Sequence, residues 1–533
     1  MRNQKLRGFP VADCSTMSER RKTSVLVTCA AVIFVVTISV IIQFIYMPLG
    51  VDGALYTYPA VSLSRGGDPG ESQLGVEELK NIKGVKATWG YDLSRTIRVL
   101  PMSWWFRVFG ANIWTVKTLG LLKTLLLFAI MYFVLQRSSG NREVVLLLWM
   151  IYLTDSIVLG LSTKLRPDII VTILTLIVFM LVNTRFENTK NSILIFFLAL
   201  LSMFLLGVTH ITAAISLSLL ICYMIAGIVF SWRSMTKFKK SLYISLIMTG
   251  ILGFLMRKGI SAVLVPSQYL DRIGSNTVVD VEKSVYTLLS GGMLPLIGKE
   301  VSRWVDYFYP YNLPLLFVIF MAVFLFVANI TGSSGRKPSP SQMSILIGII
   351  GALGVLALDP HPWTSHALVI VPFFIIFLAN EIKLTNAVKL KHAVICLLLV
   401  LVVLSAGSQA VSTGRIVMKC TQTGFSNQAV IDLMKNVFSE EKPYLVVGSA
   451  ALWPYINPKT DVTIFDAKIG KMDDLSRYMT KIDYFFLDKD YKDYEWKKHF
   501  REKYPDVALE TVAEIGKEDS GWPFVKVMKP VVQ

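Results

Sequence analysis

The sequence predicts a polytopic α-helical membrane protein with a small α/β domain at its C-terminus. Three observations support this fold class. The 533 residues are 53% hydrophobic and only 17% charged, and the mean hydropathy is +0.54. The apolar residues form repeated runs of about 20 residues, the length that crosses a bilayer as a helix. Beyond about residue 410, short β-rich runs alternate with helical patterns, which is typical of an α/β domain.

About eleven apolar runs reach or approach the length of a membrane span. Basic residues gather before the first run and in alternate loops, a pattern that marks the cytoplasmic side. We therefore expect a multi-pass protein of the bacterial inner membrane, with the N-terminus in the cytoplasm and the C-terminal domain outside. The predicted spans lie near residues 24–46, 113–135, 143–162, 167–184, 191–208, 211–231, 241–259, 313–331, 343–358, 367–380 and 391–408.

The formal charge of +17 does not indicate a nucleic-acid-binding protein, because the excess sits in short loops between apolar runs. The five cysteines show no CxxC or metal-binding spacing and suggest no disulfide framework. The first apolar run is long and lacks a clear cleavage site, so we interpret it as a membrane helix and not as a signal peptide. The expected parts are a cytoplasmic segment 1–23, a membrane domain 24–409 with outer loops 47–112 and 260–312, and an extracytoplasmic domain 410–533.

The C-terminal segment contains three predicted strands, at Tyr444–Gly448, Val462–Phe465 and Asp483–Leu487. A helical pattern over Met472–Lys481 separates the last two strands, and a helix-like stretch follows the first. This alternation predicts a partly parallel sheet. The segment has no GxGxxG pattern and no P-loop, so nucleotide binding is not supported.

Asp52 stands out because it follows the first apolar run within a few residues. A carboxylate at the end of a membrane helix is costly near lipid, so it tends to mark a solvated cavity, a structural cap or a catalytic site. The stretch from Asp52 to Gly67 has apolar and aromatic residues at helical spacing and ends in two glycines. Asp52 would cap that short outer helix, a role that is compatible with service as a catalytic base.

Three further segments carry recognisable patterns. Leu161 to Asp168 ends in Arg-Pro-Asp at the start of a predicted span. Pro101 to Gly110 belongs to a stretch with Trp104 and Trp105 that we expect to lie at the membrane interface. His366 to Pro372 opens a late span.

Together with Asp52-x-Ala-x-Tyr56 and the following Ser-Leu-x-Arg-Gly-Gly, these segments resemble the GT-C glycosyltransferases. The similar families are the dolichyl-phosphate-mannose protein mannosyltransferases and the bacterial aminoarabinose transferases. The resemblance implies a GT-C fold and transfer of a sugar from a polyprenyl phosphate, with inversion, to a lipid, polysaccharide or protein acceptor. It implies that Asp52 is the general base and that Asp168 is the second acidic residue of the site. Without the resemblance, Asp168 equally fits pairing with Arg166 or Lys164 at a helix start.

The sequence departs from the family pattern at two places. Gly53 stands where many members carry a second acidic residue, and Tyr91 to Thr96 lacks the lysine and prolines of the bacterial relatives. Asp92 and Arg95 could substitute in that region. Arginine suits the leaving phosphate through its bidentate fork, although each outer cation also fits a solvated or headgroup contact. The candidate substrate-binding residues are Tyr56, Asp92, Arg95, Arg166, Arg257, Arg303, His361 and His366; further outer cations are Arg98, Lys164, Lys258, Arg272 and Lys299.

The sequence shows no ligand motif for a metal or cofactor, because the histidines do not form a compact metal motif. The resemblance leaves a divalent metal open, since some GT-C enzymes use one. Asp155 is a rare carboxylate within a predicted span and hence a further functional candidate. The leading hypothesis is thus a lipid-linked-sugar glycosyltransferase. A transporter or lipid flippase is the alternative, although no repeat relates the two halves and the spans are mostly free of charge. A non-catalytic assembly protein is the third hypothesis.

Overall fold

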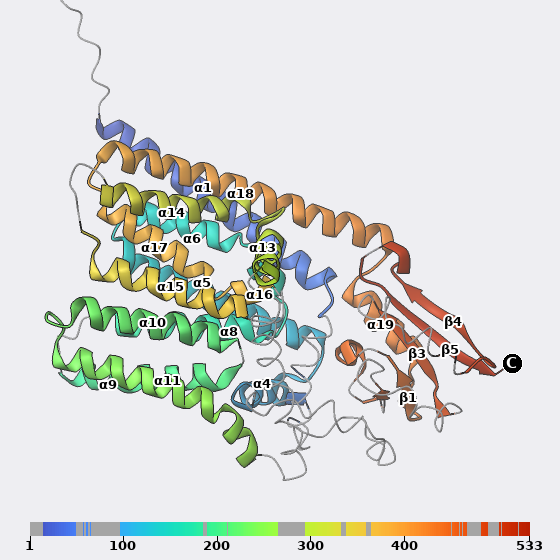
Figure 1. Cartoon of the computed structure of the whole chain (residues 1–533). Helices are drawn as coiled ribbons and strands as arrows, with labels where there is room; N and C mark the ends of the chain where they lie inside the picture. The colour runs from blue at the N-terminus through green and yellow to red at the C-terminus, as the bar shows by residue number, and fades with distance from the viewer. Residues whose placement is uncertain are drawn as a thin grey trace, which may run out of the picture.

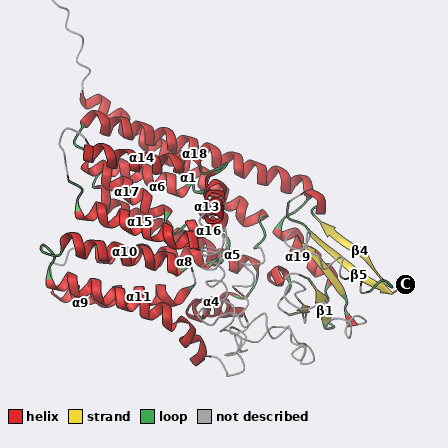
Figure 2. Cartoon of the chain, viewed as in Figure 1, coloured by secondary structure: helices red, strands yellow, loops and turns green. Residues whose placement is uncertain are grey.

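The computed structural model consists of a long helical bundle and a C-terminal sheet (Figure 1), with strands confined to the C-terminal domain (Figure 2). This architecture confirms the predicted fold class. The structure describes residues 14–49, 57, 60–61, 64, 96–184, 189–210, 212–264, 294–331, 337–358, 364–448, 450–457, 459–460, 462–465, 481–488, 500, 502, 504–520 and 522–532.

All eleven predicted spans form helices. Nine described helical segments are long and apolar enough to cross a membrane. The other two predicted spans are shorter in the structure: 167–184 forms α8 (Pro167–Val182), and 143–162 is divided into α6 (Arg142–Leu153) and α7 (Ser156–Leu161). The remaining bundle helices are α1 (Cys14–Tyr46), α5 (Ile113–Ser139), α9 (Thr189–Thr209), α10 (Ala213–Ser231), α11 (Lys237–Leu264), α14 (Leu313–Thr331), α15 (Pro340–Leu358), α17 (Val371–Leu384) and α18 (Val388–Thr423).

The bundle has two ends that Figure 1 distinguishes clearly. We call the end where α1 begins and where α10 turns into α11 the inner end, because the charge pattern predicts that it faces the cytoplasm. The outer end faces the C-terminal sheet and carries the short helices α4 (Thr96–Phe109), α13 (Leu294–Phe308) and α16 (Thr364–Ala367). The predicted interfacial stretch thus forms a helix, α4, at the outer end.

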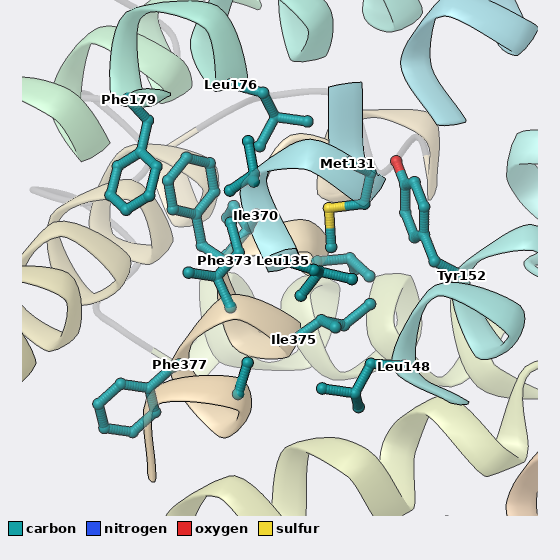
Figure 3. Packing of buried hydrophobic residues seen from close by; sticks show 14 of the residues in the cluster. Met131, Leu135, Leu148, Tyr152, Leu176, Phe179, Ile370, Phe373, Ile375 and Phe377 are labelled. Atoms are coloured by element: carbon teal, nitrogen blue, oxygen red, sulfur yellow. The ribbon is translucent and has the colours of Figure 1, made fainter. Parts of the chain in front are cut away.

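The core of the bundle is formed by large apolar side chains from α5, α6, α8 and α17. Met131, Tyr152, Phe179 and Phe373 are among its buried members (Figure 3). Phe179 and Phe373 pack edge to face with ring centroids 5.2 Å apart, a favourable aromatic geometry. This contact links the last turn of α8 to the first turn of α17.

Helix α18 connects the bundle to the C-terminal domain without a break. Its 36 residues correspond to about 54 Å, which exceeds the roughly 30 Å of a bilayer core. Figure 1 shows its outer part continuing past the other helices toward the sheet. The predicted domain boundary at residue 410 falls inside this helix, which ends at Gly424 in a left-handed conformation.

The sheet has five strands in the order β2-β1-β3-β5-β4. β1 (Tyr444–Val447) pairs in parallel with β2 (Val462–Phe465) and β3 (Tyr484–Asp488), whereas β5 (Val525–Val532) is antiparallel to β3 and to β4 (Val507–Ile515). The three predicted strands and the partly parallel sheet are confirmed. The predicted helix over Met472–Lys481 falls almost entirely outside the described residues.

A second apolar cluster joins the C-terminal domain to the outer end of the bundle. Val99, Met102 and Phe106 form one buried face of α4, and they share this cluster with Phe425 and Phe486 from the domain. The opposite face of α4 is also apolar and exposed, as Trp104 illustrates with 65% exposure. An apolar exposed face suits contact with lipid, while the buried face anchors the domain.

Candidate active site

The structure describes four of the ten predicted site residues in full. Arg166, Asp168, Arg303 and His366 lie at the outer end of the bundle, on or beside α8, α13 and α16. Arg257 belongs to α11, but its side chain lies outside the described part. The others, Asp52, Tyr56, Asp92, Arg95 and His361, lie outside the described residues.

The break between α6 and α7 is built around Asp155. Its Oδ1 accepts hydrogen bonds from the backbone N–H groups of Ile157 (2.8 Å) and Val158 (3.2 Å), so the carboxylate caps α7. The Tyr307 hydroxyl donates to Oδ2 (2.5 Å), and the Asn312 amide donates to Oδ1 (3.2 Å). A buried carboxylate needs such partners, and these make Asp155 an anchor between the α6–α7 junction and α13.

Arg166, which is partly exposed, and the buried Asp168 form an ion pair where α8 begins. Pro167 occupies the first helical position, where its fixed φ favours a helix start. Asp168 lies in the first turn, where the helix dipole favours a negative charge. The Arg166 guanidinium donates through Nε to Asp168 Oδ2 at 3.1 Å, and the Asp168 side chain is fully buried. The sequence analysis offered two interpretations of Asp168, a second acidic residue of the site or a partner of a cation at a helix start. The pairing with Arg166 is present in the structure.

The other carboxylate oxygen, Asp168 Oδ1, has no hydrogen-bond partner within the described part of the chain. The Ser162 and Thr163 hydroxyls in the preceding turn are likewise buried and have no hydrogen-bond partner among the described residues. Buried polar atoms normally carry hydrogen bonds. Three such atoms within one short connection indicate a place that can accept and donate hydrogen bonds to a polar ligand.

That connection rests directly on α5 at Gly120. A β-carbon at Gly120 would lie 2.9 Å from the Ser162 carbonyl oxygen and 3.0 Å from the Thr163 carbonyl carbon. Only a glycine allows the backbone of residues 162–164 to approach α5 this closely. Lys123, one turn further along α5, donates to the Arg166 carbonyl at 3.4 Å. α5 thus sets the position of the segment that carries Asp168.

Lys117, also on α5, holds the C-terminal end of α1. Its side chain is fully buried, and Nζ donates to the backbone oxygens of Gln43 (3.3 Å), Phe44 (2.6 Å) and Met47 (2.5 Å). The last carbonyls of a helix lack partners within the helix and carry partial negative charge. A lysine ammonium therefore stabilises this terminus, which ends at Tyr46, six residues before Asp52 in the sequence.

Two cationic side chains of α13 donate hydrogen bonds to the last carbonyls of α15 in the same way. Lys299 donates to the Ala357 carbonyl at 3.0 Å, and Arg303 donates to the Leu356 carbonyl at 2.8 Å. Arg303 is fully buried and also forms an ion pair with Glu300 at 2.7 Å. Its role in binding a substrate phosphate stays a prediction, but the structure assigns it a capping role as well. His366 lies on α16, which packs against α13, and is 3% exposed.

The sequence analysis did not single out Lys117, Tyr307 or Asn427. The buried lysine could have been suspected, because it stands in an apolar run. Within the described part of the chain, no group of three or more histidine, cysteine, aspartate or glutamate side chains could hold a metal ion.

No protein-family model and no curated protein matches the sequence. The structure, however, is similar to solved structures of ArnT from Cupriavidus metallidurans. The structure of ArnT bound to undecaprenyl phosphate matches with a TM-score of 0.54 and 11% identity, over 94% of this chain and 97% of ArnT. ArnT in the apo state matches with the same score and identity, over 95% and 98%. The similarity therefore extends over the bundle and the C-terminal domain.

Proposed function

The chain has the GT-C fold, and from this premise we propose that it is an inverting glycosyltransferase of the cell envelope. The donor is a sugar linked to a polyprenyl phosphate, and the acceptor is a lipid, glycan or protein on the extracytoplasmic side. The observation that carries the proposal is a full-length structural match to a protein that binds undecaprenyl phosphate. The sequence motifs around Asp52 and Arg166-Pro167-Asp168 support it independently.

Asp52 is the proposed general base. Its carboxylate takes the proton from the acceptor hydroxyl or amine as that group attacks the anomeric carbon. The bond between this carbon and the phosphate oxygen breaks, and the polyprenyl phosphate leaves with the electron pair. Attack from the face opposite the phosphate inverts the configuration. The phosphate is already a good leaving group, so the reaction needs one base and cations more than it needs an acid.

Asp168 is proposed to orient a substrate. Arg166 holds its Oδ2, while Oδ1 is buried without a partner among the described residues. A carboxylate oxygen in that state accepts a hydrogen bond from a sugar or acceptor hydroxyl. Such an oxygen also discriminates strongly, because a substrate that lacks the hydroxyl leaves it unpaired.

Replacement of Asp52 by asparagine tests the base. Membranes that contain the wild type or Asp52→Asn, expressed to equal levels, are incubated with polyprenyl-phosphate-linked sugars, and lipid and product are followed by mass spectrometry. We expect the rate of transfer to fall by about 100-fold or more, since general-base catalysis contributes roughly that factor. Asp68→Asn, in the same loop but outside the motif, is the matched control and should transfer at the wild-type rate.

Near-wild-type transfer by Asp52→Asn would remove this residue as the base. Movement of the lipid across reconstituted vesicles, with no covalent product, would instead favour a transporter or flippase.

A further inference from the structure

The end of α1 is held by the C-terminal domain as well as by Lys117. Asn427, the first residue of α19 (Asn427–Val437), is fully buried. Its side-chain amide donates to the backbone oxygens of Phe44 (3.0 Å), Ile45 (2.8 Å) and Met47 (3.2 Å). Lys117 and Asn427 thus share the terminal carbonyls of α1 between them, which are the groups that a helix end leaves unpaired.

The chain delivers Asn427 to this place through a tightly bonded turn. Gly424 adopts φ 71° at the end of α18, and the Phe425 N–H bonds back to the Cys420 carbonyl at 3.0 Å, as in a helix-ending Schellman turn. Ser426 then caps α19, its hydroxyl accepting from the Ala429 N–H at 3.0 Å. The turn is therefore fixed on both sides of Asn427.

Tyr455 sets the orientation of the Asn427 amide. The tyrosine belongs to the 3-10 helix η4 (Ala450–Tyr455), which lies between β1 and β2. Its hydroxyl donates to Asn427 Oδ1 at 2.7 Å, so the NH₂ group is the one that faces α1. Burial raises the pKa of the Tyr455 hydroxyl, which outweighs the opposing effect of the nearby Leu49 backbone and keeps the proton in place.

We propose that Lys117, Asn427 and Tyr455 are positioning residues for the loop that starts at Met47, so that the C-terminal domain helps to set the placement of Asp52. Lys117 and Asn427 both bond to the Met47 carbonyl, and Leu49 is buried in the same apolar cluster as Tyr455. Asp52 follows Leu49 by three residues. A displacement of about 1 Å in a reacting group can cost about 100-fold in rate. The catalytic part of this inference rests on the proposed function, whereas the positioning part does not.

The rate of amide hydrogen exchange at Leu49, measured on the full-length protein, tests whether these residues hold the end of α1. The hydrogen bonds by which Lys117, Asn427 and Tyr455 hold the end of α1 are called the clamp below. Three variants weaken it with little change of volume: Asn427→Asp removes the amide donor, Tyr455→Phe removes the hydroxyl, and Lys117→Met removes the ammonium. We expect the Leu49 amide to exchange about tenfold faster in each, because these buried bonds protect the end of α1. Asn457→Asp and Tyr444→Phe are the matched controls, since their side chains bond to Glu440 and Ser439 within the domain.

Kinetics on the same variants separate positioning from general stability. With a polyprenyl-phosphate-linked sugar as donor, kcat should fall by about 10- to 100-fold, while KM for the donor stays within about twofold. Lys117→Arg, which keeps a cationic donor, should recover part of the rate. Asp52→Asn should show wild-type exchange at Leu49, so loss of the base and loss of the clamp give different results.

Wild-type exchange at Leu49 in both Asn427→Asp and Tyr455→Phe would overturn the proposal. Faster exchange with kcat equal to that of the controls would overturn its catalytic part. If Asp52→Asn retained transfer, the proposed function would fail while the exchange result still decided whether the clamp exists.

Discussion

At the scale of single residues, charged side chains at the outer end are largely engaged with the protein itself. Lys117, Lys299 and Arg303 bond to the last carbonyls of membrane helices, and Arg166 bonds to Asp168. The last carbonyls of a helix have no partner within the helix, and lipid offers no hydrogen-bond donor. Carbonyls at a helix end near lipid therefore need donors from the protein. Several cations that sequence suggests for phosphate binding therefore have a prior structural role.

Removal of Arg166 tests the importance of its ion pair with Asp168. Arg166→Ala leaves the Asp168 carboxylate without this cation, so we expect a loss of about 3 kcal/mol in the free energy of unfolding. Adding Asp168→Asn to Arg166→Ala should recover part of that loss, because the uncompensated charge is gone. The measurement is thermal unfolding of the purified protein in detergent. A double variant as unstable as the sum of the single ones would contradict an interaction between the two.

Sequence alone could predict the Arg166–Asp168 contact, because Pro167 fixes the start of a helix and the two residues flank it. It could not predict the clamp on α1. The partners of Asn427 lie more than 370 residues earlier in the chain, and no local pattern encodes such a pair. Lys117 was recognisable only as a lysine in an apolar run, a position that also suits a side chain reaching toward the interface.

At the scale of elements, apolar runs predicted the spans well, because each crossing demands a helix. The division of 143–162 into α6 and α7 was missed, since hydropathy averages over the polar pair Thr154 and Asp155. An aspartate directly before Ser156 is a helix N-cap signal, and it could have located the break. The partners of Asp155, Tyr307 and Asn312, lie in another part of the sequence and could not be predicted from it.

The contact between α5 and the α7–α8 connection gives a prediction about Gly120. Gly120→Ala places a methyl group against the backbone of Ser162 and Thr163, so the segment that carries Asp168 must shift. We expect the rate of sugar transfer to fall by about tenfold or more, since small displacements at a reactive site are costly.

Gly407→Ala in α18 is the control, because a β-carbon there meets nothing within 4 Å. It should retain full activity and gain slightly in stability, as alanine favours a helix over glycine. Equal activity of the two variants would show that the close approach at Gly120 does not position the site.

At the scale of the whole molecule, the charge pattern predicts which end of the bundle faces the cytoplasm. Arg233 lies exposed in the inner α10–α11 turn, and Glu510 lies exposed on β4. In a variant with no native cysteine, Glu510→Cys should react with a membrane-impermeant maleimide added from outside. Arg233→Cys should react only after the membrane is opened. The reverse pattern would invert the proposed topology and place the reaction in the cytoplasm.

The continuity of α18 has a rotational consequence. A helix turns by about 100° per residue, so one residue inserted into the outer part of α18 would swing the C-terminal domain about the helix axis and turn Asn427 away from α1. Seven inserted residues would nearly restore the angle, yet would raise the domain by about 10.5 Å. The length of α18 and its rotation about its own axis are therefore both constrained, because Asn427 must reach the end of α1 at one height and in one direction.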